Sequence, residues 1–120
     1  MPLPRALRAA LGERALGCCE VCGKPNPTDP HHRKRKSQGG LDTLANLLDL
    51  CRDCHRSVHL NVKHSRRHGR LLHRHDHPAS VPVWRWSRVH GAMRLVMLRD
   101  DGTIDEEVQP WHEVTLWADR

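Results

Sequence analysis

Two pairs of cysteines constrain the fold of this chain more than any other sequence feature. Cys19 and Cys22 form one Cys-x2-Cys pair, Cys51 and Cys54 form another, and 28 residues separate the pairs. The two-residue gap lets both sulfurs of a pair face one ion, and four thiolates suit tetrahedral zinc. A site closed by four cysteines has no open position for water, so the predicted zinc is structural.

The composition gives such a zinc a role in folding. The chain has 120 residues, with no Phe, no Tyr and four Trp. A chain of this length is expected to form one domain. Its core is poor in bulky side chains, so a bound metal would compensate for the stability that this core lacks. The fifth cysteine, Cys18, makes the number odd, which favours a metal over disulfides and leaves Cys18 as a bystander. The alternative is that the four paired cysteines are buried without a metal.

The charge of the chain favours a polyanionic partner. Lys and Arg number 20 against 14 acidic residues, which gives a net charge of +6. The basic residues gather at 31–36 and 63–77, and the acidic ones at 100–107. A basic surface is typical of nucleic-acid binding, although charge alone leaves a merely solvated surface equally open. No apolar run reaches the roughly 20 residues of a membrane span, and residues 1–17 lack a secretory apolar region, so we expect the cytoplasm.

The pattern of apolar residues predicts an α+β fold. Leucines at helical spacing predict a helix over 4–16 that stops at Gly17. Short strands are expected at 31–32 and 44–50, followed by a helix from about 51–53 to 67. Further strands are expected at 81–86, 93–98, 103–108 and 114–117, with a turn at 100–102. We therefore divide the chain into an N-terminal helix (1–17), a zinc-stapled module (18–68) and an appended antiparallel β-sheet packed on the same domain (69–120).

Histidines lie within and just after the cysteine pairs. His55 and His59 are four residues apart, so on a helix they project from one face, which is a common metal-binding arrangement. Chance pairs are frequent among 11 histidines, and a solvated surface is the alternative. This pair directly follows Cys54, so the zinc would fix the helix that carries it. His31 and His32 are neighbours on a predicted strand, where they point to opposite faces and have different roles.

These residues, in this order, resemble a known family. The motifs are Cys19-x2-Cys22-Gly23, His31-His32-Arg33, Gly39-Gly40, Leu44-x-Asn46-Leu47 and Cys51-x2-Cys54-His55-x3-His59. Over about residues 13–60 the chain resembles HNH endonucleases, and more narrowly the small HNH nucleases of phages and actinobacteria. The resemblance implies a ββα-metal (HNH) module that carries a four-cysteine zinc.

The resemblance also implies roles for individual residues. His32 matches the general base that activates water, and His31, His55 and His59 match the ligands of a catalytic divalent ion. Asn46 matches the residue whose amide bonds the loop backbone and holds the strand of His32 in register. Mg²⁺ is the expected cellular ion, although an all-imidazole site would bind Mn²⁺, Ni²⁺ or Zn²⁺ more tightly.

The resemblance implies the function of a metal-dependent DNA endonuclease that leaves 5′-phosphate and 3′-hydroxyl ends. Arg33, Arg35 and Lys36 are candidates for phosphate contacts, with a solvated loop as the alternative. The alternative function is a non-catalytic, zinc-stapled nucleic-acid-binding module or an accessory of a phage packaging machine. DNA is the expected partner and a membrane is not, while a homodimer or a packaging (terminase) partner stays open. The expected location is the cytoplasm of a bacterium or of a phage-infected host cell.

Overall fold

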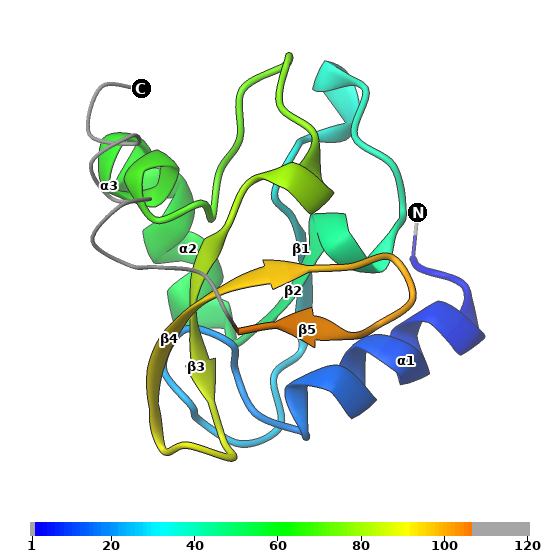
Figure 1. Cartoon of the computed structure of the whole chain (residues 1–120), viewed down its shortest axis with the longest axis vertical. Helices are drawn as coiled ribbons and strands as arrows, with labels where there is room; N and C mark the ends of the chain where they lie inside the picture. The colour runs from blue at the N-terminus through cyan, green and yellow to red at the C-terminus, as the bar shows by residue number, and fades with distance from the viewer. Residues whose placement is uncertain (1, 107–120) are drawn as a thin grey trace.

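The structure is a computed structural model that describes residues 2–106. Helices and short strands alternate along this part of the chain. In chain order the elements are α1 (Arg5–Ala15), β1 (Asp29–His32), η1 (Lys36–Gln38), η2 (Leu44–Asn46), β2 (Leu47–Leu50), α2 (Arg52–Leu60), α3 (Val62–Arg67), η3 (Pro78–Ser80), β3 (Val83–Ser87), β4 (Ala92–Leu98) and β5 (Ile104–Asp105). Figure 1 shows α1 on one side of the molecule, α2 and α3 on the other, and the strands between them. This mixed fold with small antiparallel sheets confirms the predicted α+β class.

Strand β2 lies at the centre and is buried on both faces. It pairs antiparallel with β1, so that His31 is opposite Leu48. Successive side chains of a strand point to opposite faces. Leu48 and Leu50 accordingly enter the main core, whereas Leu47 packs with Leu11 of α1. A strand covered on both sides gives β1 and its histidines a fixed support.

The main core joins the cysteine pairs to the second sheet, β3–β4–β5. It contains two of the paired cysteines together with side chains from β2, α2, β3 and β4. Its buried members are Cys19, Ala45, Leu48, Leu50, Cys51, Val58, Leu71, Val83, Val96 and Leu98. Because the cysteines are part of this core, a metal bound to them would act on the packing of the whole cluster.

Helix α1 follows the prediction closely. It begins after Pro4 and ends at Ala15, where Leu16 adopts a left-handed conformation. Gly17 also has a positive φ of 71°, and its amide donates to the carbonyl of Gly12. This hydrogen-bond pattern closes the helix at the residue that the sequence marked as its stop.

Two predicted elements are interrupted. The strand expected at 44–50 is a 3-10 turn at Leu44–Asn46, and strand β2 begins only at Leu47. The helix expected to run to 67 breaks at Asn61, which has φ −119° and separates α2 from α3. The side-chain amide of Asn61 donates a hydrogen bond to the carbonyl of Ser57. Side chains that bond a nearby backbone carbonyl in this way compete with helical hydrogen bonding and favour the end of a helix.

The C-terminal sheet matches the prediction as far as the structure describes it. β3 and β4 pair antiparallel, and β4 pairs with β5 after a turn in which Gly102 has φ 88°. The end of the strand expected at 103–108 and the strand expected at 114–117 lie outside the described residues. None of the helices within 2–106 is long and apolar enough to cross a membrane.

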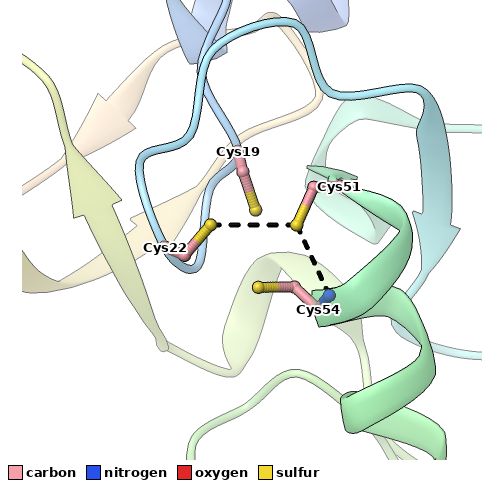
Figure 2. Close-up of side chains that lie close together, drawn as sticks. All are labelled: Cys19, Cys22, Cys51 and Cys54. Carbon is pink, nitrogen blue, oxygen red and sulfur yellow. Dashed lines mark hydrogen bonds between the residues drawn. The ribbon is translucent and has the colours of Figure 1, made fainter.

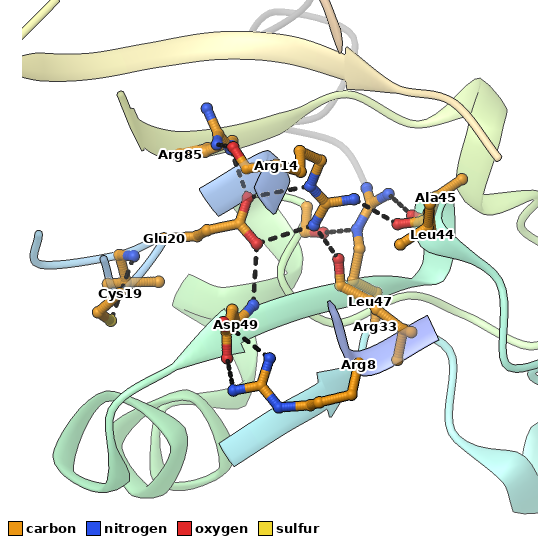
Figure 3. A network of polar contacts seen from close by, with 12 residues as sticks. Arg8, Arg14, Cys19, Glu20, Arg33, Leu44, Ala45, Leu47, Asp49 and Arg85 are labelled. Atoms are coloured by element: carbon orange, nitrogen blue, oxygen red, sulfur yellow. Dashed lines mark hydrogen bonds and ion pairs between the residues drawn. The ribbon is translucent and has the colours of Figure 1, made fainter. Parts of the chain in front are cut away.

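A buried ion network fastens this sheet to the rest of the chain (Figure 3). The Glu20 carboxylate receives hydrogen bonds from Arg14 of α1 and Arg85 of β3, and one of its oxygens also accepts the backbone amide of Asp49 at 2.9 Å. Arg14 donates further to the carbonyls of Leu44 and Leu47. Burial alone would raise the pKa of Glu20, but the attraction of the two guanidinium groups holds it below its usual value.

Glu20→Ala is therefore expected to destabilise the protein by about 3–5 kcal/mol, because it leaves two buried cations without their partner. Denaturant unfolding of the metal-loaded protein measures the change. The matched control is Asp105→Ala, which breaks the exposed pair with Arg99 at 3.1 Å and should cost less than about 1 kcal/mol. Equal effects of the two substitutions would contradict a structural role for the buried network.

Candidate metal centres and active site

The four paired cysteines form one cluster (Figure 2). Cys19 and Cys22 come from the loop after α1, Cys51 caps α2, and Cys54 lies in its first turn. Their sulfurs all lie within 4.8 Å of one another, and those of Cys22 and Cys51 are 3.8 Å apart. Sulfurs at the usual zinc distance of about 2.3 Å occupy the corners of a tetrahedron about 3.8 Å apart. The cluster therefore has the donor set and the size of a structural metal site.

Backbone amides and burial shape this cluster further. The amide of Val21 lies 3.4 Å from the sulfur of Cys19, and that of Cys54 lies 3.4 Å from the sulfur of Cys51. Burial raises the pKa of Cys19 and of Cys54. At Cys51 burial also acts to raise the pKa, but the hydrogen bonds from the Cys54 amide and from the neighbouring thiols together outweigh it and lower the pKa. A bound cation would be needed to hold these buried sulfurs together as thiolates. Cys18 is buried but does not belong to the cluster.

Three histidines form a second cluster. His31 comes from β1, and His55 and His59 come from one face of α2. One ring nitrogen from each lies within 4.8 Å of the others, and the ring centroids are 5.0–5.2 Å apart. Burial falls from His31, which is 1% exposed, to His59 at the surface. The group is close enough to share one divalent ion, and three protein ligands leave positions open for a substrate.

Two of these rings are held by hydrogen bonds to groups outside the cluster. Nε2 of His31 lies 2.7 Å from the carbonyl oxygen of Arg70, and Nδ1 of His55 lies 3.1 Å from Oδ2 of Asp29. A carbonyl or carboxylate can only accept, so each of these nitrogens carries the proton and the other nitrogen keeps a lone pair. Burial lowers the pKa of His31 to about 3, which keeps it neutral as a ligand must be.

His32 lies next to His31 but is not a member of the cluster. Its Nε2 is 2.7 Å from Oδ1 of Asp42, which also lies 3.5 Å from Nζ of Lys36. The hydrogen bond from His32 holds the pKa of Asp42 below its usual value. With Nε2–H donated to a carboxylate, Nδ1 of His32 keeps the lone pair. The two adjacent histidines thus have different surroundings, as strand alternation requires.

Asn46 holds the loop between the two strands of the hairpin. Its side-chain amide nitrogen donates to the carbonyls of Lys34 and Leu41, both at 3.0 Å, and its Oδ1 accepts from the amide of Lys34 at 2.7 Å. Gly40 lets this loop close, since a Cβ there would lie 1.8 Å from the carbonyl oxygen of Lys34. The loop that follows His32 is therefore fixed by one buried amide.

Arg33 is a correction to the predicted phosphate contacts. It is 0% exposed, and its guanidinium donates to the carbonyls of Ala45, Gly69, Pro78 and Val81. A side chain enclosed in this way joins the hairpin to the C-terminal segment and cannot reach DNA. Arg35 and Lys36 are exposed, as a phosphate contact requires. Burial lowers the pKa of His59, and the charges of His55 and Arg35 add to the effect.

Sequence reasoning missed two carboxylates that touch the histidines. Asp29 lies two residues before His31, and Asp42 lies ten residues after His32. A signal for Asp29 was its place on the same strand and face as His31, at a spacing of two. No local sequence pattern indicated Asp42, because its contact with His32 depends on the path of the loop between them.

Comparisons with known proteins agree with this geometry. Residues 19–60 match the HNH endonuclease family. The chain is similar to the Type IV methyl-directed restriction enzyme EcoKMcrA of Escherichia coli (strain K12), with 36% identity over 62 residues. The match covers 44% of this chain and 22% of that enzyme, so the similarity spans about a fifth of the relative's length. No solved structure matches the chain.

Proposed function

We propose that this chain, whose residues 19–60 match the HNH endonuclease family, is a metal-dependent DNA endonuclease that leaves 5′-phosphate and 3′-hydroxyl ends. The observation that carries the proposal is the convergence of His31, His55 and His59 within 4.8 Å inside this segment. The similarity to part of a restriction enzyme supports DNA as the substrate. We propose zinc for the four-cysteine site and the cytoplasm of a bacterial or phage-infected cell as the place of action.

The three histidines are the proposed ligands of the catalytic ion. They would hold a divalent ion whose positive charge would polarise the phosphate and stabilise the departing 3′ oxygen. Mg²⁺ is the proposed cellular ion, and the imidazole donors favour tighter binding of Mn²⁺, Ni²⁺ or Zn²⁺. His31 would bind through Nδ1, because its Nε2–H is donated to the carbonyl of Arg70.

His32 is the proposed general base. Its Nδ1 lone pair accepts the proton of the attacking water, while Nε2–H remains on the carboxylate of Asp42. As the ring becomes positively charged, the negative charge of Asp42 stabilises it. Asn46 contributes by holding the loop that follows His32, which keeps the base in register with the metal ligands.

Arg35 and Lys36 are the proposed phosphate contacts beside the site. Both are exposed, so their contacts would position the DNA backbone and weaken with salt. Residues 2–106 contain one such three-histidine site, so cutting both strands would require a homodimer or two successive binding events. If the chain instead acts as an accessory of a phage packaging machine, a terminase partner would supply the DNA.

A plasmid assay tests the proposal. Supercoiled plasmid incubated with the zinc-loaded protein and Mg²⁺ or Mn²⁺ is expected to become nicked or linear, and EDTA should stop the conversion. DNA ligase should reseal the nicks, because it requires 5′-phosphate and 3′-hydroxyl ends. If the protein retards plasmid on a gel but never nicks it with either metal, the non-catalytic binding module is the correct function.

A further inference from the structure

Asp29, the first residue of β1, contacts the histidine cluster from outside it. Its Oδ2 accepts a hydrogen bond from Nδ1 of His55 at 3.1 Å, and Nε of Arg52 lies 4.0 Å from the same oxygen. Its Oδ1 accepts from the hydroxyl of Thr28 at 2.8 Å. Both carboxylate oxygens are therefore engaged, and the group is held facing α2.

This contact decides which nitrogen of His55 can bind a metal. A neutral imidazole has one N–H and one lone pair, and Asp29 can only accept at Nδ1. The lone pair is then on Nε2, which leaves Nε2 as the nitrogen that can bind a metal. We propose that Asp29 is a positioning residue that fixes the tautomer and ring orientation of His55 for metal binding. The inference rests on the proposed function in taking a divalent ion as the ligand of this cluster.

Asp29 acts through His55 and is not itself a ligand. Among residues 2–106, the cluster whose donor atoms lie within 4.8 Å of one another contains the three histidines without Asp29. A carboxylate that holds a ligating imidazole from behind makes the ring a more basic donor. The same position on His31 is filled by a main-chain carbonyl, that of Arg70, which substitution cannot remove. Substitution of Asp29 can therefore test whether the hydrogen bonds to the ligand histidines support metal binding.

The test is the substitution Asp29→Ala in zinc-loaded protein. Mn²⁺ is the probe, because it prefers nitrogen and oxygen ligands to the thiolates of the other site. Calorimetric titration is expected to show Mn²⁺ affinity about 10–100-fold weaker than in the wild type. In protein free of Mn²⁺, ¹⁵N NMR of the His55 ring should change from a single Nδ1–H tautomer to a mixture. Asp29→Asn can still accept at Nδ1 and should keep the tautomer.

The matched control is Asp53→Ala, which removes an exposed carboxylate from the first turn of the same helix. It should leave both Mn²⁺ affinity and the His55 ring signals unchanged. Wild-type affinity and an unchanged His55 tautomer in Asp29→Ala would overturn the inference. If Asp29→Ala loses affinity only because it unfolds, Asp29→Asn becomes the test. A folded Asp29→Asn protein with an altered His55 tautomer would then also overturn the inference. If the wild type fails to nick DNA while Asp29→Ala changes the tautomer and Mn²⁺ affinity, the proposed function fails and this inference stands.

Discussion

Removal of the metal from the four-cysteine site is expected to unfold the described chain, not only the two cysteine loops. Cys19 and Cys51 are members of the main core, and Cys51 also joins β2 to α2. Structural zinc contributes an apparent 10–16 kcal/mol in small zinc-dependent peptides, which is comparable to the roughly 5–15 kcal/mol that stabilises a typical domain. A core without Phe or Tyr has little to replace that contribution.

The measurement combines a chelator titration with far-UV circular dichroism and an indicator for released zinc. Zinc release and loss of helix signal should coincide. Cys51→Ser should behave like the chelated protein, whereas Cys18→Ser, a buried thiol outside the cluster, should keep one equivalent of zinc. If a full equivalent of zinc leaves while the melting temperature stays unchanged, the site does not stabilise the fold.

His32→Ala is expected to reduce plasmid nicking by about 10²–10⁴-fold, the usual contribution of a general base. Zinc content, melting temperature and Mn²⁺ affinity should remain those of the wild type. The reason is positional: His32 is bonded to Asp42 and is not a member of the three-histidine cluster. The rates are measured with saturating Mn²⁺, so that a change in metal affinity cannot appear as a change in rate.

His75→Ala is the matched control, because His75 has an 82% exposed side chain and pairs only loosely with Asp76, at 3.8 Å. That variant should nick at the wild-type rate. A His32→Ala protein that also nicks at this rate would remove His32 from the mechanism. A variant that loses Mn²⁺ binding along with nicking would instead make His32 part of the metal site.

Local spacing was sufficient to predict the groups that later converge. The two-residue gap in each cysteine pair and the four-residue gap between His55 and His59 are properties of a turn and of a helix, so they survive in any fold that contains those elements. Strand alternation likewise separated His31 from His32. The family resemblance added the order in which these groups occur and the role of each.

The contacts that distant segments make with these groups were decided by the tertiary structure. Arg33 looked like a surface cation in a basic run, but its acceptors lie 12–48 residues away and enclose it. Asp42 reaches His32 only because Asn46 closes the loop between them. Asn61 breaks the helix that the sequence predicted to run to residue 67.

The sequence by itself therefore determined which residues can bind a metal, because the type of each residue and its spacing from the next determine the donor atoms and their short-range geometry. The tertiary structure decided which nitrogen His31, His32 and His55 present, which cations remain at the surface and which are buried. Those properties depend on hydrogen bonds and desolvation by segments far away in the chain, and no local pattern encodes them.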